Sequence, residues 1–220
     1  MKLIPYLLVL LLFLPALLFA GDTGNCHCFR NRSFDPTDKY GADDYLLATS
    51  YNSLIASVFD ISKGTIIMKK MKGGINENDL IIGLYIVKKT KKPLGLLLSV
   101  RDDGGSWQQI VGAALHEKEE IKDPILTAIA TGKGDTPILQ RINNYMLKTR
   151  YLSTRATLAE IRSSGLNSRE SNLLLALHEQ TGAQLGQLLS MARQQKMSWS
   201  EIAHHFGLAP GEVGKKILRK

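Results

Sequence analysis

The sequence predicts an all-α, multi-helical protein with two duplicated four-helix units in a pseudo-twofold relation, and three observations predict this class. Apolar residues recur at three- and four-residue steps, as in Leu80, Leu84 and Val87, which is typical of helices with one buried face. Residues that favour helix N-caps precede such segments, and glycines follow them. The passage LGLLLSVRDDGGSW at 94–107 returns as LGQLLSMARQQKMSW at 185–199. We therefore expect about ten helices, many of them in corresponding pairs.

Residues 1–20 have the composition of a secretory signal peptide. The stretch MKLIPYLLVLLLFLPALLFA carries one charge at Lys2, an apolar run from Leu7 to Leu14 and a small residue at Ala20. This pattern predicts cleavage after Ala20 and a periplasmic or secreted protein. The alternative is an uncleaved anchor, because the stretch is nearly long enough to span a bilayer. After cleavage, no remaining segment is apolar enough to span one.

Residues 21–42 are predicted to be a flexible tail, and its sequence NCHCF contains both cysteines of the chain. Cys26, His27 and Cys28 could together bind a soft metal ion such as Cu(I) or Zn(II), although a tetrahedral site needs a fourth ligand. The alternative is a disulfide role in an oxidising compartment. Because two cysteines cannot form a disulfide framework, the fold must depend on its hydrophobic core.

A leading helix is predicted within residues 43–60. From Asp43 to Phe59 the apolar residues fall on one helical stripe. These residues are Leu46, Leu47, Tyr51, Leu54, Ile55 and Val58.

Residues 61–115 are predicted to form the first four-helix repeat. Ser62 and Asn76 are typical N-caps for its first two helices, and Gly73-Gly74 separates them. Pro93 suits the first turn of the third helix.

The third helix is expected to end at Gly104-Gly105, and Ser106 then caps a short fourth helix in which Trp107 can face a core. Residues 116–151 form the connection between repeats. They begin with an exposed, charged stretch, HEKEEIKD, and contain two further helices that start near Asp123 and Pro137.

The second repeat is predicted within residues 152–220. Ser153 aligns with Ser62 and Asn167 with Asn76 at an offset of 91 residues, so Ser153 is expected to be an N-cap. One extra residue shifts the offset to 92, and Trp199 then aligns with the only other tryptophan. The alternative is a coincidental similarity between amphipathic helices.

The C-terminal stretch SWSEIAHHFGLAPGEVGKKILRK resembles a helix-turn-helix DNA-binding unit over about twenty residues. The resemblance implies that a second helix, starting near Pro210, enters the major groove. Its basic residues would be Lys215, Lys216, Arg219 and Lys220. However, Gly211 and Gly214 take positions where a reading helix needs side chains, and the predicted signal peptide directs the protein away from chromosomal DNA. A structural helical hairpin is the alternative interpretation.

The chain has a formal net charge of +8, or +7 once Lys2 is removed with the signal peptide. Between residues 63 and 92, eight lysines stand against Glu77 and Asp79, whereas the matching window 154–183 is balanced. If the helices that carry these lysines pack side by side, they form an anion-binding face. Its candidate residues are Lys69, Lys70, Lys72, Lys88, Lys89, Lys91 and Lys92. The alternative is a solvated surface without a partner.

No catalytic motif stands out. His116-Glu117 and His178-Glu179 lack the second histidine of the HExxH zinc pattern. The sequence therefore predicts a non-enzymatic, exported binding or interaction protein without a cofactor. Its expected partner is an anionic envelope component or an acidic protein, bound through the lysine-rich first repeat. The alternatives are nucleic-acid binding through the C-terminal hairpin and metal or thiol handling by Cys26, His27 and Cys28.

Overall fold

The computed structural model describes residues 29, 31–114 and 122–219, and Asn31–Lys220 form one compact unit. In these residues there are twelve α-helices and no strand, so the predicted all-α class is confirmed. The predicted signal peptide and the residues Cys26, His27 and Cys28 lie outside the described residues. No helix in the described part of the chain is both long enough and apolar enough to cross a membrane.

The helices fall into two series of similar lengths. The first series is α2 (Asp43–Phe59), α3 (Lys63–Met71), α4 (Glu77–Thr90), α5 (Leu94–Asp102), α6 (Trp107–Ala114) and α7 (Pro124–Ala130). The second is α8 (Asp135–Tyr151), α9 (Arg155–Ser163), α10 (Ser168–Thr181), α11 (Leu185–Arg193), α12 (Trp199–His205) and α13 (Pro210–Leu218). Helices α2 to α6 have 17, 9, 14, 9 and 8 residues, and α8 to α12 have 17, 9, 14, 9 and 7.

Several helices begin directly after a capping side chain. Ser62 Oγ accepts from the amide of Thr65 at 3.0 Å, and Asn76 Oδ1 accepts from the amide of Asn78 at 2.8 Å. Asn167 and Ser198 both form capping boxes, in which a glutamate three residues later bonds back to the cap. Local side-chain chemistry therefore sets where these helices begin.

Two predicted boundaries were wrong by one residue. The N-cap of α9 is Thr154 and not Ser153, because Leu152 takes the left-handed conformation that ends α8 and the new helix starts three residues later, at Arg155. Pro93 is the N-cap of α5 and not part of its first turn.

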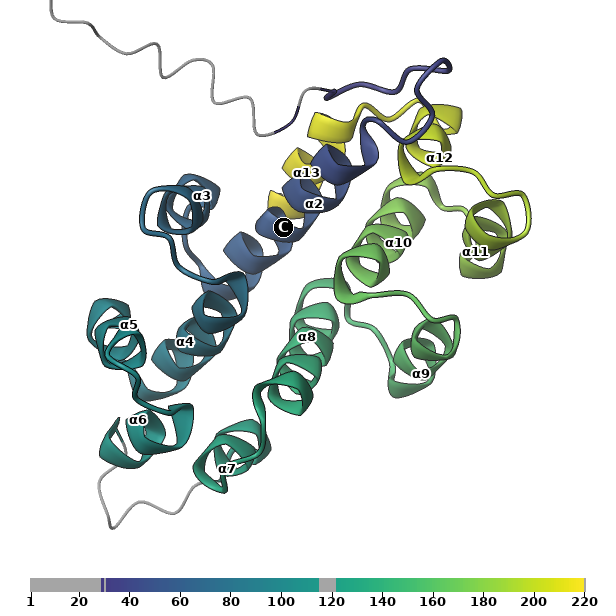
Figure 1. Cartoon of the computed structure of the whole chain (residues 1–220). Coiled ribbons are helices and arrows are strands. Elements are labelled where there is room, and N and C mark those ends of the chain that lie inside the picture. The colour runs from purple at the N-terminus through teal and green to yellow at the C-terminus, as the bar shows by residue number, and fades with distance from the viewer. Residues whose placement is uncertain (1–28, 30, 115–121, 220) are drawn as a thin grey trace, which may run out of the picture. The chain divides into compact units, whose positions relative to one another are not determined.

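The longest helices form two rows (Figure 1). In one row α2 leads towards α4, and in the other α10 leads towards α8. Helix α2 packs against α13, α10, α3 and α8, while α4 packs against both α5 and α8. The hydrophobic core of these helices includes both Trp107 and Trp199, which are 3% and 7% exposed. The shorter helices α3, α5, α9 and α11 lie beside the rows.

Helix α13 lies close to α2 because it presents a glycine there. A Cβ atom added to Gly214 would lie 3.1–3.2 Å from Lys63 Nζ, Ser53 Oγ and the carbonyl oxygen of Thr49. Both Gly214 and its neighbour Val213 are buried. The glycine that was unsuitable for a DNA-reading helix therefore serves a packing role.

Candidate ligand-binding cavity

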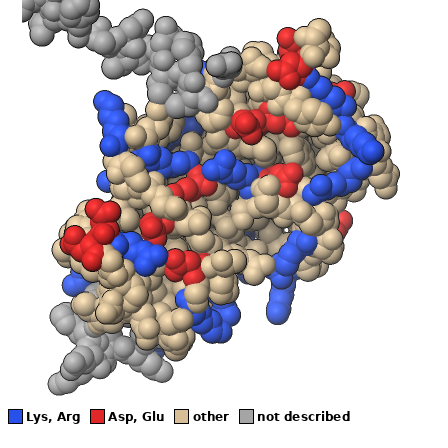
Figure 2. All heavy atoms as spheres, in the orientation of Figure 1, with Lys and Arg blue, Asp and Glu red and all other residues tan. Residues whose placement is uncertain are grey.

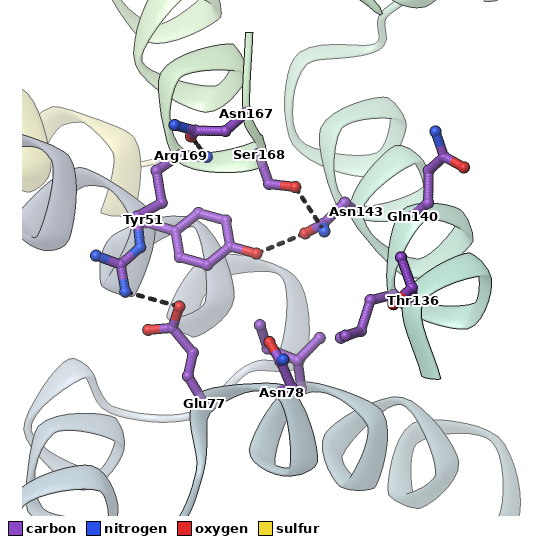
Figure 3. Close-up of a pocket in the computed structure, with 11 residues that line it drawn as sticks. Tyr51, Glu77, Asn78, Thr136, Gln140, Asn143, Asn167, Ser168 and Arg169 are labelled. Atoms are coloured by element: carbon purple, nitrogen blue, oxygen red, sulfur yellow. Dashed lines mark hydrogen bonds and ion pairs between the residues drawn. The ribbon is translucent and has the colours of Figure 1, made fainter. Parts of the chain in front are cut away.

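A cavity of about 640 Å³ opens where four helices meet, and its size is within the usual range for small-molecule sites. The N-terminal turns of α4 and α10 and the sides of α2 and α8 surround it (Figure 3). The described residues that line it are Tyr51, Glu77, Asn78, Ile81, Thr136, Leu139, Gln140, Asn143, Asn167, Ser168 and Arg169.

The helix caps place the first-turn side chains at the cavity. Because Asn76 caps α4, the next two residues, Glu77 and Asn78, lie in its first turn. Asn167 caps α10 in the same way, so that Ser168 and Arg169 lie in the corresponding turn. Two helices that begin after an asparagine thus direct polar side chains into one space.

Glu77 is held between two cations. Arg169 Nη2 donates to its carboxylate at 2.8 Å, and Lys70 Nζ on α3 donates to the other carboxylate oxygen. Burial alone would raise the pKa of Glu77, but the hydrogen bonds from Lys70 and Arg169 outweigh it and hold this pKa below its ordinary value. The guanidinium of Arg169 also lies 5.9 Å from the ring centroid of Tyr51. The one carboxylate of the lining is therefore ionised and neutralised within the protein.

A chain of neutral hydrogen bonds crosses the floor of the cavity. Tyr51 Oη donates to Asn143 Oδ1 at 2.5 Å, and Asn143 Nδ2 donates to Ser168 Oγ at 2.8 Å (Figure 3). Burial raises the pKa of Tyr51, so its hydroxyl stays protonated and remains a donor. These bonds join α2, α8 and α10 and fix the shape of the floor.

The rim of the cavity carries polar side chains that are available to a ligand. Asn78, Thr136 and Gln140 are exposed, and their side chains form no hydrogen bond with another described residue. Together they offer two carboxamides and a hydroxyl, each of which both donates and accepts. The half-buried Leu139 adds an apolar surface to the lining, behind which Ile81 is 1% exposed.

The seven candidate lysines fall into two groups in the structure. Lys69, Lys70 and Lys72 lie at the end of α3, and the other four lie at the end of α4, a helix of 14 residues that spans about 20 Å. Because the α3 group precedes the start of α4, the two groups are at opposite ends of that helix. Figure 2 shows basic and acidic side chains interspersed on the visible surface.

Three of these lysines have partners within the fold. Lys70 bonds Glu77 and also Asn52 at 3.1 Å, Lys88 donates to the carbonyl of Val58 at 2.7 Å, and Lys89 pairs with Asp123 at 2.9 Å. The remaining four, Lys69, Lys72, Lys91 and Lys92, have no ion pair with any residue that the structure describes.

The C-terminal hairpin of α12 and α13 buries one face of α13. Pro210, Val213, Gly214 and Ile217 are buried, whereas Lys215, Lys216 and Arg219 are exposed and Lys220 lies outside the described residues. Arg150 Nε on α8 donates to the carbonyl of Ile217 at 2.8 Å, which satisfies a free carbonyl at the end of α13. Helix α13 thus contributes to the core of the fold.

None of the cavity residues was predicted as a site from the sequence. The sequence contains one indication of the cavity, the alignment of Asn76 with Asn167. Each of these asparagines caps a helix whose first turn is polar. Only the tertiary structure brings those turns together. Within the residues that the structure describes, no group of three His, Cys, Asp or Glu side chains could hold a metal ion.

No protein-family model matches the chain, and neither a curated protein nor a solved structure matches it.

Proposed function

We propose that the chain is an exported, non-enzymatic binding protein, built from two duplicated helical units, whose cavity binds a small polar ligand. The observation that carries this proposal is the cavity itself. It has a size typical of ligand sites, a floor fixed by internal hydrogen bonds and exposed polar groups at its rim. Export follows from the predicted signal peptide at residues 1–20.

The helix lengths and the left-handed residues support the duplication. Left-handed backbone conformations occur at Asp60 and Leu152, which are 92 residues apart, and at Lys91 and Gly182, which are 91 apart. Each pair ends a helix of the same length in the two series. Since α2 and α8 also correspond, each duplicated unit would contain five helices rather than four.

The contacts of the two tryptophans also support the duplication. Trp107 Nε1 donates to Asp79 at 3.1 Å, and Trp199 Nε1 donates to Glu170 at 3.3 Å. Asp79 and Glu170 are 91 residues apart, at the third position of α4 and of α10. The same indole-to-carboxylate contact therefore links the corresponding helices of both units.

A pseudo-twofold axis between the units accounts for the position of the cavity. Tyr51 and Asn143 occupy the same position in α2 and α8, and they bond to each other. A direct contact between corresponding residues is expected where a twofold axis passes between two copies. The cavity would then be a product of the pairing of the two units.

The lining supports a binding role rather than catalysis. None of the described residues that line the cavity is a histidine or cysteine. Its single carboxylate, Glu77, is neutralised by Lys70 and Arg169 and is thus poorly suited to donate or accept a proton near pH 7.

A cavity-filling variant tests the proposal. Gln140→Trp places a large side chain at the rim, where the wild-type residue is exposed and has no bond to break. Its neighbour Arg141, also exposed, is not part of the lining, so Arg141→Trp is the matched control. We expect ligand-induced thermal stabilisation in the wild type and in Arg141→Trp, and its loss in Gln140→Trp. The test compounds are glucose, N-acetylglucosamine, trehalose, glycine, glutamate, adenosine and inorganic phosphate.

A second candidate function is weak binding to an anionic surface through Lys69, Lys72, Lys91 and Lys92, which have no ion pair in the described part of the chain. Vesicles of phosphatidylglycerol would bind the wild type at low salt, and vesicles of phosphatidylcholine would not. Replacing the four lysines with glutamine would abolish that binding. Equal binding of the glutamine variant would rule this role out.

A further inference from the structure

The chemistry of the lining identifies a ligand class, and this inference rests on the proposed function of the cavity. Helix N-termini normally attract anions because their free amide groups carry partial positive charge. Three such termini, those of α4, α8 and α10, adjoin the cavity. These termini would therefore attract an anion if nothing offset their partial positive charge.

Acidic residues already occupy the first turn of each of these helices. They are Glu77 and Asp79 in α4, Asp135 in α8 and Glu170 in α10. A carboxylate in the first turn offsets the positive end of the helix dipole and so weakens its attraction for a second anion. Three of these carboxylates, Glu77, Asp79 and Asp135, are in turn paired with cations of the protein, so the termini are already part of internal ion pairs.

The cationic side chain of the lining is also committed. Arg169 bonds Glu77 at 2.8 Å and packs against the ring of Tyr51. An anionic ligand would have to compete with Glu77 for this guanidinium, whereas a neutral ligand would not. The two charged groups of the lining, Glu77 and Arg169, sum to zero.

The remaining polar groups suit hydroxyl groups. Asn78 and Gln140 each offer a donor and an acceptor side by side, and Thr136 offers a hydroxyl. A sugar presents adjacent hydroxyls that donate and accept in the same way, and its C–H surface can lie on the half-buried Leu139.

We infer that the cavity binds a neutral, hydroxyl-rich ligand, that is, a mono- or disaccharide, through the side-chain amides of Asn78 and Gln140. Leu139 contacts the C–H face of the sugar. Glu77 and Arg169 hold the wall of the cavity through their mutual ion pair rather than by charge attraction to the ligand.

Calorimetric titration of the purified protein tests this class with glucose, N-acetylglucosamine, chitobiose and trehalose. Glutamate, adenosine and inorganic phosphate represent the charged and aromatic alternatives. We expect at least one sugar to bind with an affinity that does not change between low and high salt, because no net charge is neutralised. The double variant Asn78→Ala, Gln140→Ala should bind about tenfold more weakly or worse, since both hydrogen-bonding amides are lost.

Gln187→Ala is the control, because Gln187 is exposed on α11 outside the cavity. The affinity of this variant for the sugar should equal that of the wild type. Binding of glutamate, adenosine or phosphate but of no sugar, blocked by Gln140→Trp, would overturn the sugar inference and leave the proposed function standing. Sugar binding that survives both the double variant and Gln140→Trp would overturn the site itself. An absence of binding by every compound would overturn both.

Discussion

The hydroxyl of Tyr51 on α2 lies 2.5 Å from the amide oxygen of Asn143 on α8, and the two residues are 92 positions apart in the chain. This bond joins the first helices of the two series at the floor of the cavity. Because Asn143 also donates to Ser168, the contact positions three helices at once.

Tyr51→Phe should destabilise the protein by about 1–2 kcal/mol, because it leaves the amide oxygen of Asn143 without its donor. Urea unfolding followed by circular dichroism measures the loss. Tyr40→Phe is the control, since Tyr40 is exposed and its hydroxyl makes only a 3.3 Å contact with the carbonyl of Lys196. The control should change the free energy of unfolding by less than about 0.5 kcal/mol. Equal effects in both variants would contradict the role of Tyr51.

Gly214→Leu should cost about 2–3 kcal/mol or more, because even its Cβ atom would lie only 3.2 Å from Ser53 Oγ and from the carbonyl oxygen of Thr49 on α2. Gly186→Leu on α11 is the matched control. A Cβ atom at Gly186 would meet nothing within 4 Å, and leucine favours a helix over glycine by about 0.5–1 kcal/mol. Thermal unfolding should therefore shift in opposite directions for the two variants. A stable Gly214→Leu protein would mean that α13 does not pack tightly on α2.

Trp107→Phe and Trp199→Phe should each lower stability by about 1–3 kcal/mol, because each removes a buried N–H that donates to a carboxylate. If the units are duplicates with the same internal contacts, the two losses should be similar. Chemical denaturation of both single variants gives the comparison. A large loss in one unit and none in the other would argue against an equivalent role of the two indoles.

The pairing of Glu77 with Lys70 and Arg169 predicts a dependence of stability on pH. The pKa of Glu77 in the folded protein is lower than its ordinary value of 4.5, so folding favours the ionised form. The resulting stabilisation is present above pH 4.5 and is lost as the pH falls through the lowered pKa.

Glu77→Gln should accordingly be less stable than the wild type at pH 7 by about 1–3 kcal/mol, and the difference should shrink in acid. Unfolding free energies measured from pH 7 downward give this difference directly. A difference that stays constant across the acidic range would show that the ion pair does not depend on ionisation of Glu77.

The helices could be predicted well from the sequence because their signals are local. Ser62, Asn76 and Asn167 bond to amides two or three residues away, and those bonds are decided by neighbouring residues. The error at Ser153 has the same origin, since the neighbouring Thr154 is also a good N-cap and accepts from the amide of Thr157. Local chemistry thus predicts that a helix forms, whereas its first residue can differ by one from the prediction.

The cavity could not be predicted because it depends on contacts between distant residues. Tyr51 and Asn143 are ordinary residues on two predicted helices, and nothing near either one indicates the other. The partners of the lysines also depend on distant residues. The sequence groups Lys89 with the lysines beside it, whereas in the structure it pairs with Asp123, 34 residues further along the chain.

The packing of Gly214 against α2 has a consequence for how the protein is made. Because α13 lies far beyond α2 in the chain, the surface of α2 that it covers stays uncovered until α13 has been synthesised. A nascent chain that lacks α13 should therefore leave this part of its core exposed to solvent. Closure of the core is thus coupled to synthesis of α13.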